Sequence, residues 1–142
     1  MERLLEAVVS LLGLRHRSGF DGQAALDLEH AAGDAAEAPV IGLAGARLDW
    51  APLIHALREG GPVSHLAAQV HESLADALVR IARSAGLERV ALAGGCFQDR
   101  RLLERCVLRL RQAGFRPYWP QRVPPHEGGL AVGQALAAAR AR

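Results

Sequence analysis

The chain has 142 residues, half of them apolar and 23% charged, which is the composition of a folded globular protein. Its 17 basic residues are all arginine and face 15 acidic residues, for a net charge of +2. With so small an excess and 4% aromatic residues, the sequence disfavours nucleic acid as a direct ligand. The absence of lysine excludes Schiff-base chemistry and a Walker A phosphate loop.

The cysteines and the length of the apolar runs indicate in which cellular compartment the protein is expected. Cys96 and Cys106 are too few for a disulfide scaffold and lack a paired-cysteine metal spacing, which fits a reducing cytoplasm. No apolar run approaches the roughly 18 residues that a membrane span needs, and the first residues form a periodic segment rather than a signal peptide. We expect one soluble cytoplasmic domain, residues 1–142, without membrane contact.

The first half of the chain predicts helices around a small hairpin. Helical periodicity over 4–12 and a run of helix formers over 23–29 predict two helices joined by a glycine-containing loop. Short apolar runs between 39 and 50 predict a hairpin, and a proline in the first turn favours a helix over 52–57. Apolar residues at near-heptad spacing predict the longest helix over 63–85.

The second half of the chain predicts a βαβ unit. A short apolar strand over 89–93 is followed by a glycine pair at 94–95, an amphipathic helix over 100–113 and a second strand over 115–119. Strands joined by a crossover helix in one sheet are expected to be parallel. An alanine-rich helix over 130–139 ends the pattern. The sequence therefore predicts a helix-rich α/β lobe with a small sheet.

Two glycine pairs stand where chemistry could take place. Gly94 and Gly95 lie between a strand and a helix, where backbone N–H groups can approach a phosphate, although any tight turn of this kind also favours glycine. Cys96 follows at the helix start, where a lowered thiol pKa or the role of a small buried hydrophobe both fit. The histidines other than His126 show no metal-binding spacing and are expected in packing or surface roles.

The second glycine pair follows two candidate metal ligands. His126 and Glu127 come after two prolines and directly before Gly128, and an imidazole and a carboxylate both bind metals in proteins. A solvated loop with an acid near the start of a helix explains the same pattern. Two ligands do not complete a metal site.

Four motifs, taken in order, resemble those of one family. Residues 11–14 and 20–26 resemble its "aLLGl" and "yEGQAAm" stretches, residues 92–103 its "sGGvfqNrlL" segment, and residues 123–134 its "vPpNDGGlalGQ" segment. The family is that of the hydrogenase-maturation carbamoyltransferases, the HypF family, and the similarity covers essentially the whole chain.

The resemblance implies a fold and a reaction. It implies the last portion of the family's carbamoyl-transfer domain, half of an actin-like ATPase-type domain of the sugar-kinase, Hsp70 and actin superfamily. Such proteins form a carbamoyl adenylate from carbamoyl phosphate and ATP. They then pass the carbamoyl group to the C-terminal cysteine of a HypE partner, on the way to the cyanide ligands of [NiFe] hydrogenase. ATP or carbamoyl adenylate and a HypE-like protein are the implied ligand and partner.

The resemblance also implies a nucleotide site. Gly94 and Gly95 match the turn that approaches the nucleotide, and Asp21 matches an acidic residue that would face ribose hydroxyls. Asp99 occupies a position where the family has asparagine. Its negative charge is expected to disfavour a nearby phosphate.

The resemblance implies, in addition, a metal site that is shared with another lobe. Glu127 matches a metal-binding aspartate of the family and His126 replaces an asparagine beside it, with Zn or Fe as the implied metal. The family's remaining parts, including its paired metal-binding histidines, do not occur in this sequence. No catalytic residue is assigned, and the isolated chain is expected to be inactive. Either a missing lobe is supplied in trans, or the chain is a non-catalytic interaction or dimerisation module.

Overall fold

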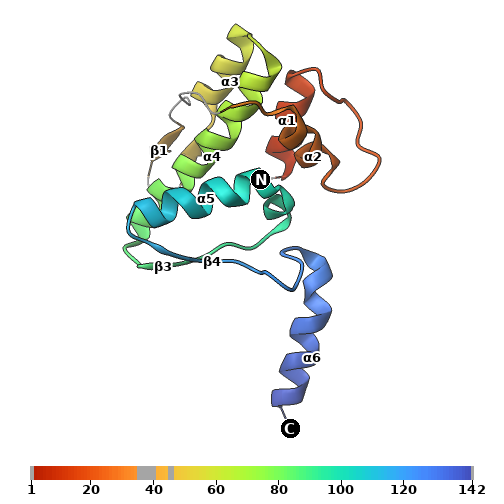
Figure 1. Cartoon of the computed structure of the whole chain (residues 1–142), viewed down its shortest axis with the longest axis vertical. Coiled ribbons are helices and arrows are strands. Elements are labelled where there is room, and N and C mark those ends of the chain that lie inside the picture. The colour runs from red at the N-terminus through yellow and green to blue at the C-terminus, as the bar shows by residue number, and fades with distance from the viewer. Residues whose placement is uncertain (1, 35–40, 45–46, 142) are drawn as a thin grey trace.

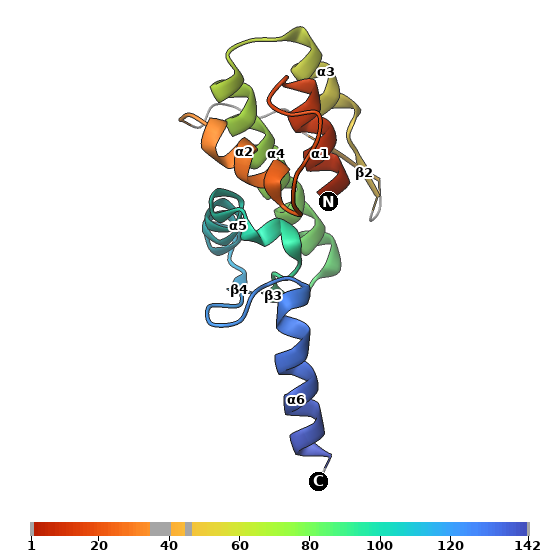
Figure 2. The same ribbon diagram turned by 90° about the vertical axis from the view of Figure 1, so that its right-hand side faces the viewer.

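The computed structural model describes residues 2–34, 41–44 and 47–141. It shows a helical body above a short parallel strand pair, with the last helix projecting from the body (Figure 1). A view from the side shows the same projection (Figure 2). The elements are α1 Glu2–Leu11, α2 Gln23–Ala31, β1 Gly42–Ala44, β2 Arg47–Asp49, α3 Ala51–Glu59, α4 Val63–Ala85, β3 Arg89–Ala91, the 3-10 turn η1 Gly95–Gln98, α5 Arg100–Gln112, β4 Arg116–Tyr118, η2 Glu127–Gly129 and α6 Leu130–Arg140.

The two N-terminal helices form as predicted and pack against each other. Apolar residues three and four positions apart place Leu5, Val8 and Val9 of α1 in the core, because that spacing puts them on one face of a helix. Helix α2 contributes Ala24, Ala25 and Leu28 to the same core. The hollow described below opens beside the loop that joins these helices.

The predicted hairpin and the helix after it are also present. Strands β1 and β2 pair antiparallel, with Gly42 opposite Asp49. Of the predicted hairpin, residues 39–40 and 45–46 lie outside the described residues. Helix α3 has a proline in its first turn, as expected, and buries Leu53 and Leu57.

The long helix α4 is the centre of the body. It spans the predicted residues and stops at Gly86, which has φ +67° and whose N–H donates to the carbonyl of Arg83. Helix α5 lies against it with its apolar face inward, burying Leu102, Cys106 and Leu110. Three neighbouring polar residues of α4 are also buried: His71, Glu72 and Ser73.

The βαβ unit is confirmed as a parallel pair joined through η1 and α5. Arg89 pairs with Arg116 and Ala91 with Tyr118. Side chains alternate between the two faces of a strand, so Val90 is half-buried while Tyr118 and the arginines are exposed. The sheet is small because each strand has three residues. The predicted helix-rich α/β lobe is therefore confirmed.

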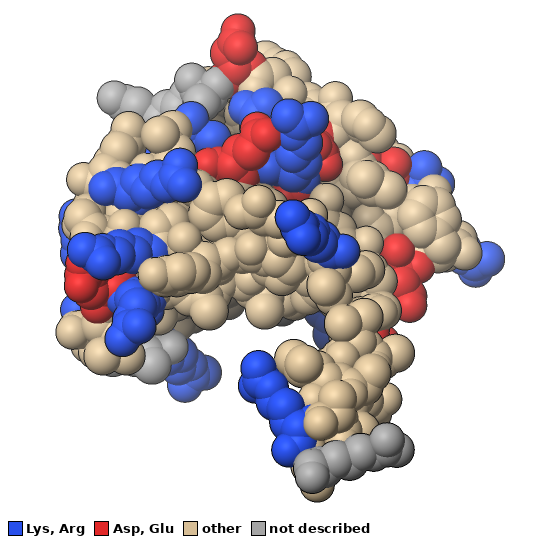
Figure 3. Space-filling view, turned by 60° about the horizontal axis from the view of Figure 1, so that its bottom comes forward, with Lys and Arg blue, Asp and Glu red and all other residues tan. Residues whose placement is uncertain are grey.

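Helix α6 differs from the other helices of the described chain. None of its side chains is buried, and Leu130, Val132 and Leu136 are more than half exposed. In the space-filling view it stands out from the body with a mostly uncharged surface (Figure 3). Within the described residues, no helix has both the length and the apolar character needed to cross a membrane.

Candidate functional site

A hollow of about 420 Å³ opens where three distant segments of the chain meet. Its walls come from the loop before α2, from the turn between β3 and α5, and from the loop before α6. The lining residues are Asp21, Gly94, Gly95, Gln98, Pro125, His126, Glu127 and Leu130. Five of the six residues that the resemblance implies therefore lie around one hollow, and the sixth, Asp99, does not line it.

The glycine turn is held on both sides by backbone hydrogen bonds. Gly94 has φ +117°, a conformation that residues with a Cβ rarely adopt, and nothing lies within 4 Å of where a Cβ would stand. Its carbonyl accepts from the N–H of Phe97 at 3.1 Å, and its own N–H donates to the carbonyl of Pro125 at 2.8 Å. The turn thus joins the two loops that form opposite sides of the hollow.

Asp21 approaches the hollow from the start of α2. It is exposed and precedes Gly22, which has φ +84° at the N-cap of the helix. Helix α2 is fastened to α5, because Glu29 accepts a hydrogen bond from the N–H of Arg100 at 3.3 Å. Arg101 donates to the carbonyl of Gly33 just beyond α2, at 2.5 Å. These contacts hold α2, the helix that Asp21 precedes, against the start of α5, the helix that follows the glycine turn.

His126 and Glu127 are both exposed in the loop before α6. Nδ1 of His126 accepts from the N–H of Gly128 at 3.1 Å, which caps the short turn η2 and places the proton of a neutral ring on Nε2. A Cβ on Gly129 would lie 2.7 Å from the carbonyl oxygen of Pro124, so this tight loop requires glycine there. Across the described part of the chain, no three His, Cys, Asp or Glu side chains gather closely enough to hold a metal ion.

Asp99 is buried and does not form part of the wall of the hollow. Its side chain is fully buried, with Oδ1 accepting from the N–H of Leu102 at the start of α5 and Oδ2 lying 2.8 Å from Nε2 of His71. A buried carboxylate with these partners does not face a ligand in the hollow. His71, expected in a packing or surface role, is fully buried, and its contact with Asp99 is not predicted by any spacing in the sequence.

A second buried charge joins α4 to α5. Glu72 binds Arg105 and Arg109, each at 2.5 Å. Burial raises the pKa of the Glu72 carboxyl, but the hydrogen bonds and positive charges of the two arginines outweigh this and hold the pKa below its ordinary value. Burial raises the pKa of the Cys106 thiol to about 12, so this cysteine behaves as a core residue, while Cys96 is half-buried.

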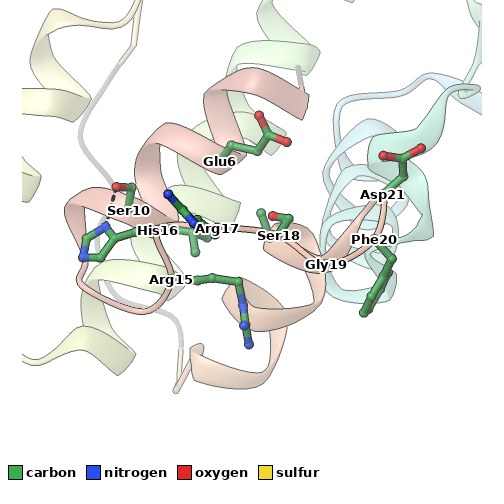
Figure 4. A pocket seen from close by; sticks show the side chains of 11 residues that line it. Glu6, Ser10, Arg15, His16, Arg17, Ser18, Gly19, Phe20 and Asp21 are labelled. Atoms are coloured by element: carbon green, nitrogen blue, oxygen red, sulfur yellow. Dashed lines mark hydrogen bonds between the residues drawn. The ribbon is translucent and has the colours of Figure 1, made fainter.

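Figure 4 shows the lining of a second cavity, of about 430 Å³. It shares Asp21 with the hollow. It lies along the loop between α1 and α2, a region that the sequence predicts only as a turn. Ser10 hydrogen-bonds to Nδ1 of His16 at 2.9 Å. The Arg15 guanidinium forms an ion pair with the Asp27 carboxylate of α2. The cavity wall is polar and carries both acidic and basic groups, so its charge does not select one class of ligand.

Comparison with known proteins identifies relatives along the whole chain. Residues 1–134 match the family described as "Carbamoyltransferase, Kae1-like Domain, second subdomain". The carbamoyltransferase HypF of Synechocystis sp. is 36% identical over 150 residues, covering 100% of this chain and 20% of the relative. That of Rhodobacter capsulatus is 38% identical over 142 residues, covering 96% and 19%.

A solved structure agrees with these matches. A crystal structure of full-length HypF in its phosphate- and nucleotide-bound form superposes with a TM-score of 0.84 at 30% identity, covering 99% of this chain and 20% of that protein. The chain thus spans about a fifth of the length of the relatives it matches. The resemblance seen in the four motifs is confirmed: the chain belongs to the HypF carbamoyltransferase family and corresponds to the second subdomain of the Kae1-like domain.

Proposed function

We propose that this chain is the nucleotide-facing part of a carbamoyl-transfer site used in hydrogenase maturation. The observation that carries the proposal is the hollow itself, which gathers Asp21, the Gly94–Gly95 turn and the His126–Glu127 loop from positions more than a hundred residues apart. Its volume of about 420 Å³ suits a small-molecule site. A full-length relative crystallised with phosphate and nucleotide bound supports a nucleotide as the ligand.

In this proposal the chain binds and orients the ligand. The Asp21 carboxylate can accept hydrogen bonds from two adjacent ribose hydroxyls, and the missing side chain at Gly94 lets a phosphate or carbamoyl group approach the backbone. The Gln98 amide can both donate to and accept from an adenine edge. None of these groups is assigned as an acid, base or nucleophile.

The proposed ligand is carbamoyl adenylate and the proposed acceptor is the C-terminal cysteine thiol of a HypE-like partner. In the transfer, the acceptor sulfur forms a bond to the carbamoyl carbon, the bond from that carbon to the phosphate oxygen breaks, the thiol proton is released and AMP leaves. A reactive mixed anhydride must be kept from water. The hollow is open on this chain, so we assign its closure to the other parts of the full-length protein.

A metal at Glu127 belongs to the same proposal. Glu127 and His126 are exposed at the wall of the hollow, and a carboxylate and an imidazole are donors of types that bind Zn or Fe. Binding through Nε2 of His126 would require the ring proton to move to Nδ1, which gives up the hydrogen bond from Gly128. A stable site needs about four ligands or more, so the remaining ligands have to come from outside this chain. We therefore expect the isolated chain to purify without stoichiometric metal. Combination with the missing lobe should create metal binding that Glu127→Ala removes.

Calorimetric titration of the purified chain with ATP and AMP tests the nucleotide site. Binding should be weak, with a dissociation constant of roughly 0.1–1 mM, because half of the enclosing contacts are absent. Gly95→Val places a side chain in the hollow and should abolish the heat signal. Gly133→Val, on the exposed face of α6, is the matched control and should leave it unchanged. Tight binding that survives Gly95→Val would show that the nucleotide binds elsewhere.

A complementation assay tests the reaction. A full-length relative truncated to remove this subdomain should lose carbamoyl transfer to a HypE-like acceptor, and adding the present chain should restore part of it. The chain alone should release no pyrophosphate from ATP and carbamoyl phosphate. Turnover by the chain alone would overturn this division of labour.

A second candidate function, that of an interaction module, is favoured by α6. Its exposed leucine and valine side chains form an apolar surface of a kind that soluble proteins usually cover. Because the chain spans about a fifth of its relatives, we assign the cover to the part of the transfer domain that this chain lacks. Sedimentation of the chain alone should then show a monomer that binds the missing lobe. A stable dimer that Leu136→Asp dissociates would favour the module instead.

A further inference from the structure

A buried histidine–aspartate pair follows the wall of the candidate hollow, because Asp99 comes directly after the lining residue Gln98. His71 and Asp99 are both fully buried, and Nε2 of His71 lies 2.8 Å from Oδ2 of Asp99. Burying polar groups is costly unless hydrogen bonds compensate. We propose that this pair is a positioning element for the hollow, holding the Gly94–Gln98 segment against α4. Its relevance to nucleotide binding rests on the function proposed above.

Hydrogen-bond geometry shows how many protons the pair holds. Nδ1 of His71 lies 2.7 Å from the carbonyl oxygen of Ala67, which can only accept, so Nδ1 carries a proton. The contact between Nε2 and Asp99 needs a second proton, which either atom can carry. The pair is therefore neutral overall, as imidazolium with carboxylate or as imidazole with carboxylic acid.

Asp99 is the joint between η1 and α5. Its backbone N–H donates to the carbonyl of Cys96 at 3.3 Å, which closes η1. Its carbonyl accepts from the N–H of Leu103 at 3.1 Å, and its Oδ1 caps the helix by accepting from Leu102 at 2.8 Å. With Oδ2 on His71, every hydrogen-bonding group of this residue is used, so its position is fixed by α4.

The joint lies one residue from the wall of the hollow. Gln98 immediately precedes Asp99, and Gly95 is four residues away, at the start of the same short turn. The N–H of Gly94 in turn holds the carbonyl of Pro125, beside the second glycine loop. A continuous series of bonded groups thus runs from α4 through His71 and Asp99 to two walls of the hollow.

This arrangement changes what is expected of position 99. An asparagine there would make the same two contacts, with Oδ1 accepting from Leu102 and the amide donating to Nε2 of a neutral His71. Protonated Asp99 makes the same two contacts with a neutral His71. The alternative, a carboxylate paired with a protonated His71, also has no net charge. The negative charge expected from the sequence therefore does not reach the hollow, and Asp99→Asn should leave nucleotide binding within about twofold instead of strengthening it.

Amide hydrogen exchange of Gly94, measured by NMR without nucleotide, tests the positioning role. Asp99→Ser keeps an N-cap oxygen for α5 but is too short to reach His71, and His71→Leu removes the other partner. Each should speed Gly94 exchange by about tenfold or more, the loss expected for one buried hydrogen bond. Asp99→Asn should exchange like the unaltered chain. Val70→Ala, at the neighbouring fully buried position of α4, is the matched core control.

The outcomes separate positioning from general destabilisation. If Val70→Ala speeds Gly94 exchange as much as Asp99→Ser at equal global stability, or if Asp99→Asn behaves like Asp99→Ser, the inference is wrong. Should His71→Leu fail to fold, the milder Asp99→Ser still decides. Titration with AMP adds a second readout, in which Asp99→Ser should weaken binding by about tenfold. Absence of AMP binding in the unaltered chain would refute the proposed function, while Gly94 exchange would still decide the role of the pair.

Discussion

The chain contains two glycine pairs that each lead into a helix, and they have different surroundings. Gly94 and Gly95 lead through η1 into α5, whose start is capped by a buried aspartate and whose apolar face lies against α4. Gly128 and Gly129 lead into α6, which buries no side chain. The first turn leads into the core of this chain, whereas Gly128 and Gly129 of the second donate to His126 in their own loop, which joins the first turn through Pro125.

The difference shows which half of the candidate site this chain can specify by itself. The turn at Gly94 is hydrogen-bonded to the loop at Pro125 and leads through η1 to Asp99, which His71 of α4 contacts, so its geometry is set by this chain. Glu127 stands on an exposed loop, and α6 beyond it has an apolar face without cover. We therefore expect substitutions near the first pair to act on stability and those near the second to act on assembly.

The largest contrast should come from truncating a leucine in each helix that follows a glycine pair. Leu110→Ala in α5, where the side chain is fully buried, should lower the free energy of unfolding by about 3 kcal/mol through lost burial and a cavity. Leu136→Ala in α6, where the side chain is 52% exposed, should change it by less than about 0.5 kcal/mol. Urea denaturation measures both, and equal losses would show that α6 packs on the body.

The α4–α5 contact should also account for much of the acid sensitivity. A carboxyl whose pKa is lowered by folding contributes stability above its unfolded pKa and loses that contribution as the pH falls through the folded pKa. Glu72 is such a group. Glu72→Gln should cost about 2 kcal/mol at neutral pH, and the cost should shrink below about pH 4.

Unfolding free energies measured from pH 7 to pH 3 check this expectation. The unaltered chain should lose stability more steeply than Glu72→Gln over the acid range. Glu59→Gln, at the exposed end of α3, is the control and should follow the unaltered chain. A parallel pH dependence in Glu72→Gln would mean that the two arginines do not favour the charged carboxylate.

Local patterns were enough to predict the elements of the fold. Helical spacing, a proline in a first turn and glycine stops are properties of neighbouring residues, and α4 was predicted over its observed bounds, Val63–Ala85. The βαβ unit followed from a strand, a glycine break and a helix in succession. The exposure of α6 could not be predicted. An alanine-rich apolar helix has the same pattern whether the surface that buries it belongs to the same chain or to another part of the protein.

Only those residues of the candidate site that lie in the four motifs could be predicted from the sequence. Asp21, Gly94 and Glu127 meet at one hollow, as the four motifs together suggest. The contact between His71 and Asp99 joins residues 28 positions apart and depends on how α5 packs on α4. No spacing rule places a histidine of one helix against the N-cap of another. The sequence alone therefore predicts the charge of Asp99 at the hollow, whereas the structure buries this side chain in contact with His71.

A smaller contrast concerns the glycines themselves. Gly94→Ala forces a Cβ into a conformation with φ +117° and should cost about 1–2 kcal/mol of unfolding free energy. A Cβ at Gly128 would lie 2.9 Å from Cε1 of His126, an exposed ring that can rotate away, and φ there is not positive. Gly128→Ala should therefore cost less than about 0.5 kcal/mol. Urea denaturation of both variants would contradict this comparison if Gly128→Ala were the more costly.

The smallest expected effect on the body tests whether α6 is a separate unit. Gly133 lies inside α6, and nothing stands within 4 Å of a Cβ placed there. Gly133→Ala should favour the helix locally by up to about 1 kcal/mol through helix propensity. If α6 contributes no packing to the body, far-UV circular dichroism should show more helix while the urea midpoint, which reports unfolding of the α4–α5 core, stays constant. A midpoint that rises with the added helicity would show that α6 folds together with the core, and its exposed apolar face would then be no sign of a missing lobe.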